Sequence, residues 1–419
     1  MALDPKTLGR RLKEARENCR LSQEVAAEAA GLSRTALVHI EAGKRSLSTL
    51  ELSDLAKLYH RSVADFFAEE PIPAGKEEDA LIAIPRLTKE LVGDEAFQRE
   101  VLRCVEICRV GVELENLLGR RHPISPPFYQ PPAPRRPFEA NEQGEWVANE
   151  ERRRLGLGYA PISDMADIIN TQGIWASGVL NLPLDISGMF ISHSSIRMAI
   201  LVNYKHTRER KRFSYAHEYA HAILDRNNQA IVSKKANAPE LAERRANAFA
   251  AAFLMPSSGI EWFLGLLEKG EPSRRYRTTY DVAGDQQIEA QERPAPGSQE
   301  ITYQDVATLA HHFKVSYQAA VYRLCDLGHI RQSGKLELIE KSDLGCRYMS
   351  VLYREDIFER NPEKKERKPD LELVSQVVRL AIEAYRREEV SQGWLRDLSA
   401  TLEVSGEDLV ELAEATVAA

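Results

Sequence analysis

The residue types and the spacing of the HExxH motif at residues 217–221 are those of a catalytic zinc site. Apolar residues recur with a helical period over residues 213–224, so the motif is predicted to lie on a helix. Positions four apart share one face of a helix, and His217 and His221 can therefore offer imidazole nitrogens to one metal ion. Glu218 can reach a water held on that metal and act as the general base. The pattern predicts zinc-dependent hydrolysis.

Zinc needs at least one more protein ligand, and the best candidate is Glu243. It lies in ELAERRANAFAAAFLMP, a second strongly periodic apolar stretch, and a helix packed against the first would bring its carboxylate to the metal. Asn247 lies one turn further on the same face and is a candidate for orienting a ligand. The alternative is a pair of histidines without a metal, which would be costly to bury in an apolar helix.

Two strings of this region, RFSYAHEYAHAIL and AERRANAFAAAFLMP, resemble the ImmA/IrrE family of bacterial metallopeptidases. The resemblance implies a zinc (Zn2+) metalloendopeptidase of the gluzincin-like type, with His217, His221 and Glu243 as ligands and Glu218 as the base. It also implies a small sheet beside the zinc helix, where an edge strand would hold an extended peptide substrate. Three positions depart from the usual Thr, Gly and acid of the family without removing a ligand: Ser214, Ala220 and Arg245.

The N-terminal region indicates a second activity. Residues 6–69 are predicted to form five short helices, with Ser22 and Ser33 as N-caps around a tight turn at Gly31. The string SQEVAAEAAGLSRTALVHIEAGKRS resembles the Xre-type, phage-repressor-like helix-turn-helix domain, which implies binding to operator DNA. By this resemblance the DNA-contacting residues are Gln23, Arg34, Thr35, His39, Lys44 and Arg45.

The charge balance of this domain limits how it can bind DNA. Residues 1–70 contain 11 basic and 11 acidic side chains, so a monomer should bind weakly and with strong salt dependence. A homodimer on a palindromic site is therefore expected. The alternative is a helix-turn-helix retained as a dimerisation or protein-docking module.

The whole chain of 419 residues, with a net charge of −7 and five cysteines, is expected to be a multidomain, mostly α protein in the cytoplasm, with no membrane span and no disulfide framework. The expected fold is an all-α helix-turn-helix domain, an α+β zincin-like metallopeptidase domain with a small sheet, and a helical C-terminal region. The predicted boundaries are 1–70 for the DNA-binding domain, 77–120 for a helical connector, 121–138 for a Pro-rich linker, 139–332 for the peptidase domain and 333–419 for an interaction or sensor region.

Three local expectations accompany this division. Residues 335–358 are expected to contain strands, the polar segment 271–300 is expected to be a loop, and Pro161 is expected at the first position of a helix. A helix is also predicted over residues 94–118, with an apolar stripe for packing or dimerisation.

The sequence as a whole predicts a DNA-binding transcriptional regulator with zinc-dependent endopeptidase activity. Its substrate is expected to be a helix-turn-helix repressor, either a partner or the chain itself, in a stress, DNA-damage or phage response. The alternative is a transcriptional repressor or antitoxin without proteolytic activity, in which the zincin fold serves as a sensor or interaction module.

Overall fold

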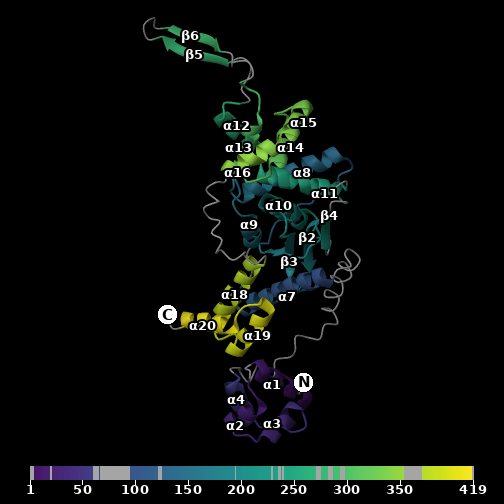
Figure 1. The fold of residues 1–419 in the computed structure, drawn as a ribbon, viewed down its shortest axis with the longest axis vertical. Helices are drawn as coiled ribbons and strands as arrows, with labels where there is room; N and C mark the ends of the chain where they lie inside the picture. The colour runs from purple at the N-terminus through teal and green to yellow at the C-terminus, as the bar shows by residue number, and fades with distance from the viewer. Residues whose placement is uncertain are drawn as a thin grey trace. The chain divides into compact units, whose positions relative to one another are not determined.

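The computed structural model describes residues 4–18, 21–59, 66, 95–120, 125–193, 195–227, 230–234, 237, 240–269, 275–281, 286–292, 298–352 and 370–417. These residues group into two compact units. The first contains Met1–Pro123, His193–Ala199 and Asp370–Ala419, and the second contains Ile124–Ser192 and Ile200–Pro369. The predicted fold class is confirmed: helices dominate both units, and a small sheet lies in the second (Figure 1).

Four short helices form the N-terminal part of the first unit: α1 (Pro5–Asn18), α2 (Gln23–Ala29), α3 (Arg34–Glu41) and α4 (Thr49–Leu58). The predicted caps are present, since Ser22 accepts from the Val25 N–H and Ser33 accepts from the Ala36 N–H, both at 3.2 Å. Gly31 joins α2 to α3 with φ +65°, a conformation that favours glycine. Leu12, Leu37, Leu55 and Tyr59 lie in one fully buried core. The fifth predicted helix falls largely outside the described residues.

The rest of the first unit is a small helical bundle. Its helices are α7 (Glu95–Leu117), α18 (Leu371–Arg386), α19 (Gln392–Leu402) and α20 (Gly406–Val417). The predicted helix over residues 94–118 is thus confirmed, and its buried stripe packs against α18 and α19. An ion pair of 2.6 Å joins Arg103 on α7 to Asp370 at the start of α18. The helix α7 and the C-terminal helices α18 to α20 therefore share one core, although they are far apart in the sequence.

The second unit carries a four-stranded sheet with the order β1-β3-β2-β4. The strands are β1 (Trp175–Val179), β2 (Ile186–His193), β3 (Arg197–Asn203) and β4 (Ala230–Lys234). β4 pairs antiparallel with β2 and forms one edge of the sheet, and the register is irregular between Ile186 and Gly188. Buried side chains dominate β1, β2 and β3, as expected for strands covered by helices.

Helices surround this sheet: α8 (Pro137–Arg154), α9 (Met165–Thr171), α10 (Arg208–Leu224), α11 (Leu241–Leu254) and α12 (Ser257–Leu266). Among the described helices, α8 and α11 pack against each other over a large part of their length. A Cβ atom at Gly144 of α8 would lie 2.3 Å from the Arg245 carbonyl oxygen, so the glycine permits this approach. The expectation for Pro161 was wrong, because Asp164 is the N-cap of α9 and its carboxylate accepts two backbone N–H groups.

Two other local expectations are corrected. Residues 335–352 are helical, as α15 (Gln332–Glu340) and α16 (Ser342–Leu352), and they pack on α13 (Tyr303–Phe313) and α14 (Tyr317–Asp326). The segment 271–300 contains a hairpin of β5 (Arg275–Asp281) and β6 (Gln286–Glu292) where a loop was expected. Both errors have the same cause: short apolar runs and polar alternation are ambiguous between helix, strand and loop without tertiary contacts.

In the part of the chain that the structure describes, no single helix is long and apolar enough to cross a membrane. The bent pair α11 and α12 passes that test only when the two helices are taken together, by length and composition.

Candidate metal centre

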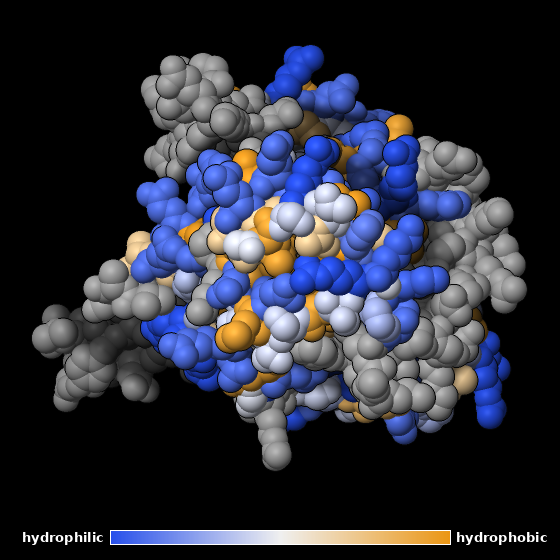
Figure 2. Space-filling model, turned by 90° about the horizontal axis from the view of Figure 1, so that it is seen from below, coloured by the Kyte–Doolittle hydropathy of each residue, from blue (hydrophilic) through white to orange (hydrophobic). Residues whose placement is uncertain are grey.

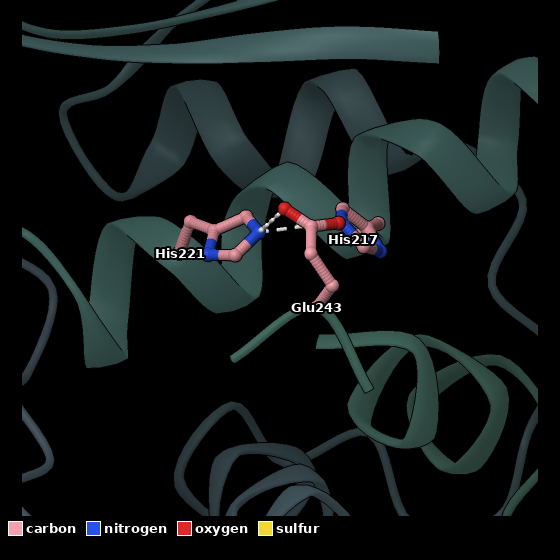
Figure 3. Close-up of side chains that lie close together, drawn as sticks. All are labelled: His217, His221 and Glu243. Atoms are coloured by element: carbon pink, nitrogen blue, oxygen red, sulfur yellow. Dashed lines mark hydrogen bonds and ion pairs between the residues drawn. The ribbon is translucent and has the colours of Figure 1, made fainter. Parts of the chain in front are cut away.

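The structure brings His217, His221 and Glu243 together in one buried cluster (Figure 3). The two histidines lie one turn apart on α10, and Glu243 lies in the first turn of α11. Their ligand atoms are all within 4.8 Å of one another. The Glu243 carboxylate lies between the two imidazole rings, with Oε2 3.1 Å from His217 Nε2 and Oε1 3.5 Å from His221 Nε2. Two imidazole nitrogens and one carboxylate oxygen are a donor set that suits zinc.

Electrostatics within the cluster favour a charged carboxylate. Burial alone would raise the pKa of Glu243, but the hydrogen bonds from the two histidines lower it to about 2. Burial alone would lower the pKa of His221, but the hydrogen bonds to Asp225 and Glu243 raise it to about 9. A cation in this cluster would compete with the proton for the His221 imidazole and pair with the charged Glu243 carboxylate.

A second group of side chains fixes the orientation of the histidine rings. Asn247 Oδ1 lies 3.0 Å from His217 Nδ1, the position predicted from the helix face. Asp225 Oδ2 lies 2.9 Å from His221 Nδ1, and Arg245 holds the other Asp225 oxygen at 2.5 Å. Carboxylates and amides in this position fix the ring tautomer, so that the Nε2 atoms face Glu243 and would be available to a metal. Asp225 was missed in the sequence, although its spacing of four from His221 could have indicated it.

Glu218 lies on the same helix and is fully buried. Within the described residues, neither of its carboxylate oxygens has a hydrogen-bond partner in the protein. Burial raises the pKa of Glu218, while His217 and His221 oppose this shift. Gly188 on β2 leaves the space for the carboxyl group, because a Cβ atom there would lie 2.9 Å from Glu218 Oε1. A buried carboxyl group whose pKa is raised, and which lies beside the candidate metal ligands, has the properties of a general base.

A buried polar network fixes α10 from its other side. Glu151 of α8 is fully buried and accepts from the Tyr219 hydroxyl at 2.5 Å and from the Tyr129 hydroxyl at 3.1 Å. Arg154 neutralises the charge of Glu151 at 2.6 Å. The Tyr129 N–H donates to the Ile223 carbonyl at 2.8 Å, so the Pro-rich segment lies against the C-terminal end of α10. Paired in this way, the network holds the motif helix in place without an unpaired buried charge.

A model of a known protein family matches the region that contains the cluster. Residues 178–283, which include α10, α11 and three of the four sheet strands in full, match the model described as the IrrE N-terminal-like domain, a peptidase family. Residues 7–66 match a helix-turn-helix domain. The chain joins a helix-turn-helix domain to an IrrE-like domain. The resemblance inferred from the sequence is therefore confirmed, and the His-His-Glu cluster lies inside the IrrE-like domain. A comparison with curated proteins found no match.

In the helix-turn-helix domain, most of the predicted DNA-contacting side chains are at the surface. Arg34, Thr35, His39, Lys44 and Arg45 are exposed, and the first three lie on α3. Viewed from below, the domain shows a small apolar area among hydrophilic side chains (Figure 2). The exposed large apolar residues of α2 to α4 are Val25, Val38 and Leu50.

Gln23 is only partly exposed, and like Arg45, which pairs with Glu51 at 2.8 Å, it has a partner within the domain. Its amide donates to Glu41 Oε2 at 2.7 Å, and Glu41 is also bound by Arg16 at 2.6 Å. This buried group ties α1, α2 and α3 together. The structure therefore gives Gln23 a partner within the domain.

Proposed function

We propose that this protein is a DNA-binding regulator with zinc endopeptidase activity, and that His217, His221 and Glu243 hold the zinc. The observation that carries the proposal is the buried Glu218 carboxylate, which lies on the ligand helix and has no protein partner among the described residues. A metal site with a purely structural role needs no such group, because its ligands alone complete it.

The positions of the side chains suggest a separate chemical role for each of them. A bound zinc would supply Lewis-acid activation of a water molecule and of the scissile carbonyl group. Glu218 accepts a proton from the attacking water and delivers it to the leaving amine nitrogen as the peptide bond breaks. Asn247 and Asp225 hold the two imidazole rings through their Nδ1 atoms. Glu243, whose pKa is lowered to about 2, would balance part of the charge of a bound cation.

The sheet offers a place for the substrate. β4 lies at the edge of the sheet and pairs with β2 on one side. An extended peptide added to the free side of such a strand gains main-chain hydrogen bonds without requiring a particular sequence. Ser233 of β4 is the strand partner of Gly188, whose backbone lies next to Glu218, so a peptide on this strand would pass near the base.

The proposed substrate is a helix-turn-helix repressor, and the fused DNA-binding domain supports this choice. Fusion places the peptidase domain at an operator whenever the helix-turn-helix domain is bound, which raises the local concentration of other proteins bound there. The substrate is then either a separate repressor at that operator or the helix-turn-helix domain of the chain itself.

The test uses the full-length protein and the Glu218→Gln variant. Zinc content is measured first, and then cleavage of helix-turn-helix proteins encoded near the gene and of the chain itself, by mass spectrometry. One zinc per chain in both proteins, with cleavage only by the wild type, is the expected result. Equal cleavage by both proteins would remove Glu218 from the mechanism, and absence of zinc from both would remove the metal site.

The alternative function is transcriptional regulation without proteolysis. It is supported by the helical bundle of α7 and α18–α20, which is a separate folded element beside the DNA-binding domain in the first unit. Under this alternative, both proteins bind zinc and operator DNA equally, and neither cleaves a protein bound at the same operator.

A further inference from the structure

A serine hydroxyl lies beside the Glu218 carboxyl group and has no role in the mechanism above. Ser233 is 2% exposed, and its Oγ has no hydrogen-bond partner among the residues that the structure describes. The two carboxylate oxygens of Glu218 are likewise without a hydrogen-bond partner in the described part of the chain, so no hydrogen bond joins the two groups in this structure. Both the hydroxyl and the carboxyl group are therefore buried polar groups that are free to form a new hydrogen bond.

The sheet places these two groups together. Ser233 on β4 is the antiparallel Cα partner of Gly188 on β2, and side chains of such partners point to the same face. That face is the one on which Glu218 lies, because a Cβ atom at Gly188 would lie 3.0 Å from Glu218 Cγ. The missing side chain at Gly188 leaves room for the carboxyl group directly beside Ser233.

The edge strand is held in register at this residue. The pairing of β2 with β4 shifts between Ile186 and Gly188, so Ser187 is the extra residue of a β-bulge. The Ser187 hydroxyl donates to the Ser233 carbonyl oxygen at 3.1 Å. Bulges redirect neighbouring side chains and are frequent beside active sites. This local structure fixes the backbone from which the Ser233 hydroxyl projects.

We propose that Ser233 is a positioning residue for Glu218: its hydroxyl donates a hydrogen bond to the Glu218 carboxylate and holds it in the orientation that accepts the proton of the attacking water. The proposal rests on the proposed peptidase function. A carboxylate held only by its own side-chain torsions samples many orientations, whereas a general base must lie within hydrogen-bond reach of its proton. A hydroxyl rotates freely, so it donates to the ionised carboxylate and accepts from the protonated one.

The principal variants are Ser233→Ala, which removes only the hydroxyl, and Ser233→Thr, which keeps it. The matched control is Ser214→Ala, because Ser214 is also 2% exposed and lies on α10, but its hydroxyl donates to the Arg210 carbonyl at 3.0 Å. Zinc-loaded full-length proteins are assayed with a quenched fluorescent peptide that reproduces the cleavage site mapped with the wild type. Ser233→Ala should lower kcat about 10- to 100-fold with unchanged KM and zinc content. Ser233→Thr and Ser214→Ala should stay within about threefold of the wild type.

A second measurement does not depend on turnover. The carboxylate stretching band of Glu218 is identified by the infrared difference between the wild type and Glu218→Gln. Ser233→Ala should shift this band, and Ser214→Ala should leave it unchanged. A wild-type kcat or an unshifted band in Ser233→Ala would overturn the positioning role. If the wild type cleaves nothing, the peptidase proposal fails separately, and an unshifted band still overturns the contact between Ser233 and Glu218.

Discussion

Substitution of Gly188 by alanine tests the geometry of the general base without touching a metal ligand. The added Cβ atom would lie 2.9 Å from Glu218 Oε1, 3.0 Å from Glu218 Cγ and 3.0 Å from the Leu201 carbonyl oxygen. Ordinary van der Waals contact begins near 3.4 Å. The Leu201 carbonyl belongs to the central strand β3 and cannot move freely, so the Glu218 side chain must give way.

The size of the effect follows from these contacts. Relief of the clash requires the carboxyl group to move by about 0.5 Å, and displacements of about 1 Å at a reacting group cost about 100-fold in rate. Gly188→Ala should therefore lower kcat about 10-fold or more. The overpacked core should also lose about 1–3 kcal/mol of unfolding free energy. None of the three atoms nearest to the added Cβ belongs to His217, His221 or Glu243, so zinc content should remain at one per chain.

The assay compares kcat, zinc content and the urea midpoint of Gly188→Ala with those of a control, Gly265→Ala. Gly265 lies on α12, and a Cβ atom there would meet nothing within 4 Å. Alanine at this helical position should leave kcat unchanged and raise the midpoint slightly. Wild-type kcat in Gly188→Ala would refute the assignment of Gly188 as the residue that makes room for the base.

Three further predictions concern the rest of the site and the DNA-binding domain. Asp225→Asn should weaken zinc binding about 10- to 100-fold in a chelator competition, because the carboxylate that orients His221 is lost; unchanged affinity would exclude that role. Lys44→Ala should lower the slope of log K against log salt by about 0.9 for operator DNA, if Lys44 contacts one phosphate; an unchanged slope would exclude the contact. Glu218→Gln should raise the unfolding free energy of the metal-free protein at neutral pH, since a carboxyl group whose pKa is raised by burial costs stability once it ionises. That gain should vanish below the ordinary carboxyl pKa of about 4.5, where both states are protonated, and a gain that persists there would point to packing instead.

The ligand cluster was predictable because it depends on local periodicity. His217 and His221 lie on one face of α10 through their spacing alone, and α11 follows close behind with Glu243 in its first turn. Asn247 follows from the same helical spacing. The two helices need only pack together, which their apolar faces dictate.

The environment of Glu218 was not predictable, because it comes from the sheet. Gly188 and Ser233 meet through the register of β2 and β4, and a one-residue change in that register would turn both away from the carboxyl group. Arg245 reaches Asp225 across two helices, which no spacing rule anticipates. The helices α15 and α16 were predicted as strands because their burial is set by other segments of the chain. In α15, for example, Leu338 is buried whereas Leu336 is 64% exposed, and the local sequence does not distinguish the two.

The burial of Glu218 is the strongest argument for a catalytic site over a regulatory remnant. A fully buried carboxyl group without a protein hydrogen bond lowers stability, and a chain that did not use it would be more stable with a neutral side chain of the same shape. The surrounding residues are arranged to keep the group there, since Gly188 gives it space and Ser233 faces it with an uncommitted hydroxyl. By contrast, the charge of Glu151 on the other side of α10 is neutralised by Arg154, and its carboxylate accepts hydrogen bonds from two tyrosine hydroxyls. One side of the helix thus stabilises the fold, whereas the side that carries the proposed metal ligands contains a buried carboxyl group that lowers stability.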